Sequence, residues 1–123
     1  MLRSLSHNYL CAAGAAALAP ALAANGSLTS IDLSKNVLTN YGSDMTGIKQ
    51  LAAALGVNGA LTNMSLAGNE LKEEGTKAIC EALEQNKTLK ELDLSGSDNI
   101  GGAAGAKHVA KMLGVNGSLT KME

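Results

Sequence analysis

The chain has 123 residues, enough for one domain with a sizeable core and too few for two ordinary domains. Its formal net charge is −1, from 10 basic and 11 acidic residues, so the charge balance indicates neither a nucleic-acid footprint nor a strongly acidic surface. Tyr9 and Tyr41 are the only aromatic residues, which argues against base-stacking platforms and aromatic-lined ligand pockets.

The first 27 residues are interpreted as a partial repeat with a helix over residues 11–24. They match a later segment at a constant offset of 61 residues, as from Asn8 to Asn69. The residues that keep this register are Asn8, Leu10, Gly14, Leu18, Leu22 and Asn25. Pro20 lies well inside the predicted helix, where a proline is expected to cost about 3 kcal/mol or to kink the helix.

Two other interpretations of this segment stay open. A secretory signal peptide would explain Arg3, the apolar run and the small residues Ala21 and Ala23. A mitochondrial presequence would explain the absence of acidic residues. A cleaved signal peptide or presequence would not need to keep the register of the later repeats, so the constant register favours the interpretation as a repeat.

Residues 28–60 predict a strand over residues 30–33 and a helix over residues 45–56. Ile31 and Leu33 alternate with polar residues, which places one face of a short strand in a core. Residues 39–46, TNYGSDMT, are longer than the corresponding link in other repeats and rich in turn formers, so we expect them to bulge outward.

Residues 61–88 and 89–118 repeat the pattern, and a partial copy occupies residues 119–123. The predicted strands cover residues 62–66 and 90–94, and the predicted helices cover residues 73–85 and 103–114. Ser97 and Asp98 enlarge the turn after the last of these strands.

The repeats predict the fold class. The copies begin at Leu28, Leu61, Leu89 and Leu119, which are 33, 28 and 30 residues apart. Neither a short strand nor an amphipathic helix can bury its apolar face alone, so successive units stack and share one core. We expect one α/β domain over residues 1–123, a right-handed solenoid with a parallel, concave sheet and outer helices.

Two asparagines recur in each repeat. Asn8, Asn36, Asn69 and Asn99 sit where the chain leaves a strand, and their side chains can satisfy backbone groups of the turn. The second set lies just past each helix, where we expect a left-handed backbone. Its members are Asn25, Asn58, Asn86 and Asn116.

The unit N-x-L-x-x-x-G-x-x-x-L-x-x-x-L-x-x-N-x-x-L-x-x-L-x-L resembles the leucine-rich repeat of the ribonuclease-inhibitor-like subfamily. That repeat type is shared with Ran GTPase-activating proteins and NOD-like receptors. The resemblance covers essentially the whole chain. It implies a horseshoe segment with about one strand and one helix per repeat, and a role in binding proteins rather than the inhibition of ribonucleases.

The sequence predicts no catalytic, cofactor or metal site. His7 and His108 have no carboxylate or Cys at metal-ligand spacing. Residues 96–108 are rich in glycine, but they lack the lysine and hydroxyl residue of a phosphate loop. Cys11 and Cys80 are expected to be free thiols in a reducing compartment, which favours a cytoplasmic location. The chain has no clear membrane-spanning run.

Another protein is therefore the expected partner, bound through the concave sheet. The side chains assigned to that face flank the inward residues of each strand. They are Ser30, Asp32, Ser34, Asn63, Ser65, Glu91, Asp93 and Ser95. They are small and slightly acidic, so a mildly basic partner is expected. A structural segment of a large assembly is the alternative, and a regulator of GTPase activity is a weaker one.

Neither end has a polar cap that would shield an outer repeat. Arg3 occupies the position that Ile31 has in the next repeat, and the chain stops at Glu123, shortly into a strand pattern. We expect a piece of a longer repeat protein, or a chain that self-associates end to end.

Overall fold

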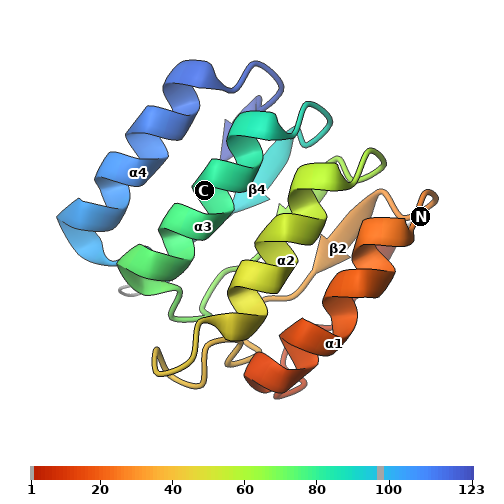
Figure 1. Ribbon diagram of the computed structural model, residues 1–123, viewed down its shortest axis with the longest axis vertical. Helices are drawn as coiled ribbons and strands as arrows, with labels where there is room; N and C mark the ends of the chain where they lie inside the picture. Colours follow the sequence, from red (N-terminus) through yellow and green to blue (C-terminus); the bar gives the residue numbers. More distant parts are fainter. Residues whose placement is uncertain (1, 97–98) are drawn as a thin grey trace.

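The computed structural model describes residues 2–96 and 99–123, and the side chains of residues 2 and 3 are not among those described. The elements alternate along the chain (Figure 1). They are β1 (Leu2–Ser4), α1 (Cys11–Ala24), β2 (Ser30–Asp32), α2 (Thr46–Val57), β3 (Asn63–Ser65), α3 (Lys72–Gln85), β4 (Glu91–Asp93), α4 (Gly102–Val115) and β5 (Lys121–Met122).

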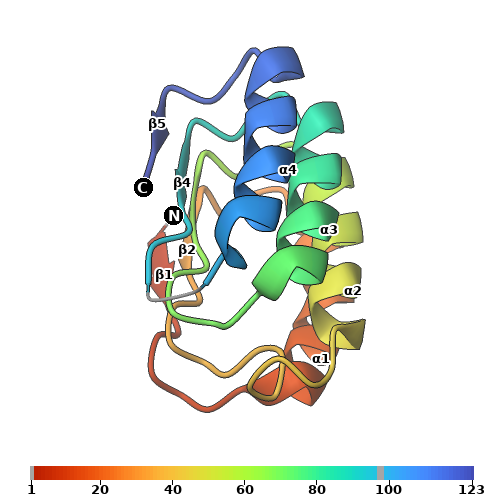
Figure 2. The same ribbon diagram turned by 90° about the vertical axis from the view of Figure 1, so that its left-hand side faces the viewer.

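The strands form one parallel sheet in the order β1-β2-β3-β4-β5. The register repeats from strand to strand, since Ile31 pairs with Met64 and Met64 with Leu92. Figure 2 shows two layers, with the strands along one side of the molecule and the helices along the other. This is the predicted α/β repeat solenoid, and the four predicted helices each fall within one residue of those observed.

The core lies between the two layers and is almost entirely aliphatic. Its strand side comes from the central residue of each strand and from the leucine that follows: Ile31, Leu33, Met64, Leu66, Leu92 and Leu94. Its helix side comes from residues four apart: Leu51 and Leu55 in α2, and Ile79 and Leu83 in α3. Both sides are buried, so each repeat covers the apolar flank of its neighbour.

Glycines near two of the helix starts allow neighbouring repeats to approach closely. Gly47 lies in the first turn of α2, against α1, and a Cβ there would lie 2.3 Å from the carbonyl oxygen of Ala12. Gly101 precedes α4 in a left-handed conformation, with a φ of 84°, and its Cβ would lie 2.3 Å from the amide nitrogen of Glu73. Both positions require a residue without a side chain.

Residues 11–24, which the sequence left open as a repeat or a targeting peptide, form α1, and this helix packs on α2. The helix continues through Pro20, which faces solvent. A proline still removes one intrahelical hydrogen bond. Within residues 2–96 and 99–123, none of the helices is long and apolar enough to cross a membrane.

The two cysteines differ in accessibility, which gives a prediction. Cys80 in α3 is 1% exposed, and burial, helped by the charges of Glu84 and Glu81, raises its pKa to about 11. Cys11 at the start of α1 is partly exposed. Because the thiolate is the reactive species, a thiol reagent at about pH 8 should modify Cys11 quickly and Cys80 only as the chain unfolds. Absorbance titration of the Cys11→Ser variant checks this, since a rapidly reacting Cys80 would contradict its burial.

Candidate functional site

The predicted binding residues lie on the face of the sheet that points away from the helices. We call this surface the open sheet face. It comprises Ser30, Asp32, Ser34, Asn63, Ser65, Glu91, Asp93, Ser95, Lys121 and Glu123. A shallow groove follows it across β2, β3, β4 and β5. Ser34 and Ser95 lie just beyond the strand ends, and those two do not line the groove.

The repeating register arranges these side chains in two rows that cross the strands. The first row contains Ser30, Asn63, Glu91 and Lys121. The second contains Asp32, Ser65 and Asp93, and Glu123 continues it where β5 ends. We call this second set the carboxylate row, because three of its four members are acidic.

Two carboxylates of this row also stabilise the turns after their strands. Asp32 accepts hydrogen bonds through Oδ1 from the Ser34 amide at 2.9 Å and from its hydroxyl at 2.6 Å. Asp93 accepts one from the Ser95 amide at 2.9 Å. An asparagine could make the same turn contact with its carbonyl oxygen, so the turn does not require the negative charge.

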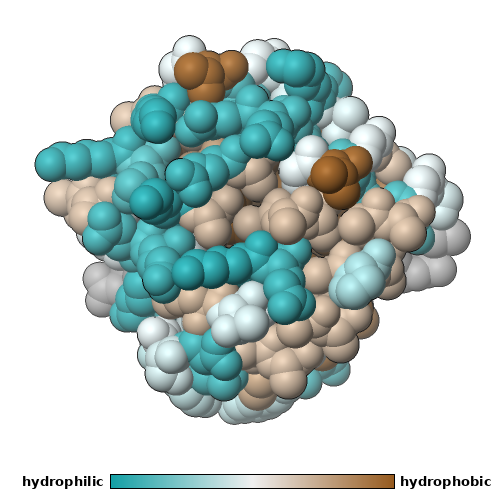
Figure 3. Space-filling model, viewed as in Figure 1, coloured by the Kyte–Doolittle hydropathy of each residue, from teal (hydrophilic) through white to brown (hydrophobic). Residues whose placement is uncertain are grey.

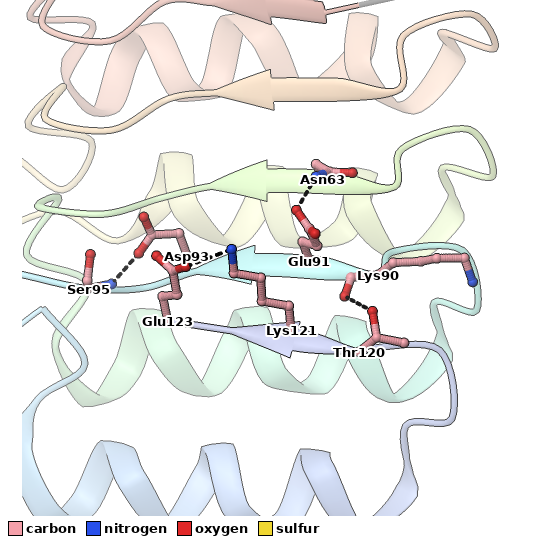
Figure 4. A network of polar contacts seen from close by, with 8 residues as sticks. All are labelled: Asn63, Lys90, Glu91, Asp93, Ser95, Thr120, Lys121 and Glu123. Carbon is pink, nitrogen blue, oxygen red and sulfur yellow. Dashed lines mark hydrogen bonds and ion pairs between the residues drawn. The ribbon is translucent and has the colours of Figure 1, made fainter.

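Figure 4 shows polar contacts among residues of β3, β4 and β5 and the segments next to them. Asn63 donates a hydrogen bond to a carboxylate oxygen of Glu91 on the neighbouring strand. Lys121 lies on β5 with its Nζ 3.1 Å from Oε1 of Glu123. The hydrogen bond and charge of Glu123 raise the pKa of Lys121, and Glu91 and Asp93 add to the effect. The open sheet face thus holds four carboxylates and one ammonium group.

The first set of asparagines connects the repeats at the turns after the strands. The Oδ1 atom of Asn69 accepts hydrogen bonds from the Asn36 amide at 2.9 Å and the Leu38 amide at 3.3 Å, both in the preceding repeat. Its Nδ2 donates to the carbonyls of Leu33 and Leu66. Asn36 and Asn99 make the equivalent contacts, whereas Asn8 in the first repeat is exposed.

Asn99 takes this position although its turn is longer. Its Nδ2 reaches back five residues to the carbonyl of Leu94, where Asn36 and Asn69 reach back three. The inserted residues, Ser97 and Asp98, lie outside the described residues.

The second set of asparagines does not have the left-handed backbone expected from the sequence. Asn58 has φ −72° and ψ 127°, and its equivalents are also extended. Its Nδ2 donates to the Leu22 carbonyl of the preceding repeat at 2.8 Å, and its Oδ1 accepts from the Leu61 amide. This asparagine connects neighbouring repeats, and the sequence of one repeat does not reveal such contacts.

The inserted loop at residues 39–46 is anchored at its base and exposed at its tip. The Thr39 hydroxyl is buried and donates to the carbonyl of Glu70, while Oδ1 of Asn40 accepts from the Ala12 amide. Tyr41 at the tip is 69% exposed. The loop therefore bridges three repeats and lies outside the groove.

The helix face is the other large surface of the molecule. Figure 3 shows it hydrophilic over α3 and α4 and more apolar over α1 and α2. The sequence of α1 contains no charged residue. Polar contacts cross between the later helices: Lys49 forms an ion pair with Glu74 at 3.5 Å, and Nε2 of His108 lies 3.3 Å from Oε1 of Glu73.

The comparisons with known proteins agree with this architecture. A family described as "Leucine Rich repeat" matches residues 85–107. A solved structure titled "Leiomodin-1 Actin-Binding Site 2 (ABS2)" is similar with a TM-score of 0.85 and 24% sequence identity, over 98% of this chain and 68% of that chain. The comparison with curated proteins found no match. The chain therefore carries a leucine-rich repeat and folds as a leucine-rich-repeat solenoid.

Proposed function

We propose that this chain is a non-enzymatic interaction module that binds a protein partner through the open sheet face. The observation that carries the proposal is the groove across β2 to β5, lined by polar side chains together with Ile31, Met64 and Leu92, and covered by no segment among residues 2–96 and 99–123. The likeness in fold to a structure whose title names an actin-binding site supports a protein as the partner.

The composition of this face bears on affinity. Ser30 and Ser65 leave room along the groove, but the face carries none of the Trp, Tyr or Arg side chains that dominate binding hot spots. We expect specificity to come from charge and from anchors on the partner, with weak binding by this chain alone.

The proposal also covers the repeat subfamily, the location of the protein and the alternative functions. The repeat spacing of 28–33 residues supports the ribonuclease-inhibitor-like subfamily. The free thiols of Cys11 and Cys80 support a cytoplasmic location. A structural segment of a large assembly remains the alternative, while regulation of a GTPase rests on the resemblance of the repeat alone.

Two matched arginine variants test the proposal. Ser65→Arg places a bulky cation in the middle of the groove, and Ala53→Arg places the same side chain on the exposed surface of α2. A partner captured from extract is purified, and its affinity for each variant is measured. Actin is the first defined partner to include. We expect Ser65→Arg to abolish binding and Ala53→Arg to preserve it, whereas the reverse would assign binding to the helix face.

End-to-end association is a separate expectation for the 123-residue chain. Leu113 on α4 is 50% exposed, Leu119 and Met122 are half-buried, and β5 forms an edge of the sheet. Exposed edges and apolar flanks favour association. Sedimentation should show self-association that disappears, with a rise in Tm, when one more repeat and a polar cap are appended. A stable monomer at high micromolar concentration would refute it.

A further inference from the structure

The carboxylate row offers more negative charge than the chain itself neutralises. Asp32 and Asp93 each use Oδ1 in a turn, and among the described side chains, those of residues 4–96 and 99–123, neither is paired with a cation. Glu123, at the end of this row, forms an ion pair with Lys121. The row is therefore complementary to cationic side chains.

Lys121 indicates how an ammonium group is held at this face. It comes from the first row, and its Nζ reaches the carboxylate of Glu123 at 3.1 Å with Glu91 and Asp93 nearby. Both members of the pair are more than half exposed. Exposed ion pairs of this kind are weak, so a cation from a partner can displace Lys121.

The spacing of the row fits an extended ligand. Neighbouring strands lie about 4.8 Å apart, so Asp32 and Asp93, two strands apart, are separated by about 10 Å. A polyproline II segment repeats its side-chain direction every three residues, or about 9.3 Å. Lysines three residues apart in such a segment would meet Asp32 and Asp93, and Ser65 between them is small enough to let the backbone pass.

We propose that the open sheet face selects an extended protein segment bearing lysine or arginine at every third residue, which crosses the strands along the carboxylate row in competition with Lys121. This inference rests on the proposed function and adds the chemistry of the partner. The cationic side chains bind at Asp32 and Asp93, and Lys121 limits the affinity at the β5 end.

The test uses the full chain and a synthetic peptide of about twelve residues with lysine at every third position. Asp32→Asn with Asp93→Asn removes two charges and keeps the turn acceptors. Glu81→Gln with Glu84→Gln removes two charges from the outer helix α3 and is the matched control. The peptide with glutamate in place of lysine controls for non-specific binding. Circular dichroism melts establish that each variant is folded.

We expect the Asp32→Asn/Asp93→Asn double variant to bind the lysine peptide at least about fivefold more weakly than the unchanged chain. The Glu81→Gln/Glu84→Gln double variant should change the affinity less than about twofold. Lys121→Gln should strengthen binding about two- to threefold, because it removes the internal competitor. Equal losses in the two double variants would mean attraction by net charge alone and would overturn the inference. Weaker binding by Lys121→Gln, or equal binding of the glutamate peptide, would also overturn it.

The variants Ser65→Arg and Ala53→Arg distinguish a failure of the inference about cationic segments from a failure of the proposed function. If Ser65→Arg blocks the protein partner while the lysine peptide shows no preference for the carboxylate row, the proposed function stands and the inference fails. If Ala53→Arg blocks the partner instead, the proposed function itself is wrong.

Discussion

Asn69→Ala is expected to lower the free energy of unfolding by about 3–5 kcal/mol. The side chain of Asn69 is 1% exposed and links two repeats. Its removal leaves the amides of Asn36 and Leu38 and the carbonyl of Leu33 without this buried partner. Each buried polar group left unpaired costs about 1–3 kcal/mol, and a small domain has only about 5–15 kcal/mol in total.

Urea denaturation measures this loss, and Asn63→Ala provides the matched control. Asn63 carries the same side chain on the open sheet face, where it contacts Thr62 and Glu91 and is only partly buried. We expect that variant to lose less than about 1 kcal/mol. Equal losses at the two positions would mean that the asparagine contacts between repeats contribute no more than surface contacts.

Leu66→Ala is expected to cost about 2–5 kcal/mol. Leu66 follows β3 in the middle of the stack, is fully buried, and packs with core residues of the flanking repeats. Truncation removes apolar contacts and leaves a cavity that the neighbouring repeats cannot fill without shifting the sheet. Chemical denaturation of the variant at low protein concentration gives the change.

Leu113→Ala is the control for the same chemical change. Leu113 lies on α4 and is 50% exposed, so its truncation should cost less than about 1 kcal/mol. If both leucine variants lost the same stability, the assignment of the inner and outer faces of the repeat would be incorrect.

The elements of the fold could be predicted because each depends on residues close in sequence. The four-residue spacing of Leu51 and Leu55 predicts α2, and the alternation of Ile31 and Leu33 predicts β2 with limits within one residue of those observed. The strand β1 was not among the predicted strands, because Arg3 stands where the pattern requires an apolar residue. Its backbone nevertheless pairs with Ile31, since a parallel ladder depends on backbone groups.

Other features could not be predicted because they depend on contacts between repeats. The backbone of Glu70 and Lys72 is left-handed, with φ of 51° and 58°, although neither residue favours that conformation. In the turn, the Lys72 amide bonds the carbonyl of Asn99 in the next repeat. The extended backbone of Asn58 and the pairing of Lys121 with Glu123 likewise follow from neighbours that the linear pattern does not specify.

Carboxyl footprinting of the chain with and without its bound partner tests the central claim most directly. Carbodiimide coupling labels accessible carboxylates, and mass spectrometry reads each position. The acidic residues divide between the two surfaces, with Asp32, Glu91 and Asp93 on the open sheet face and Glu74 and Glu81 on α3. Binding through the sheet predicts that the partner protects the first three and leaves the other two labelled as before. Protection of Glu74 and Glu81 with unchanged labelling of the sheet carboxylates would contradict it.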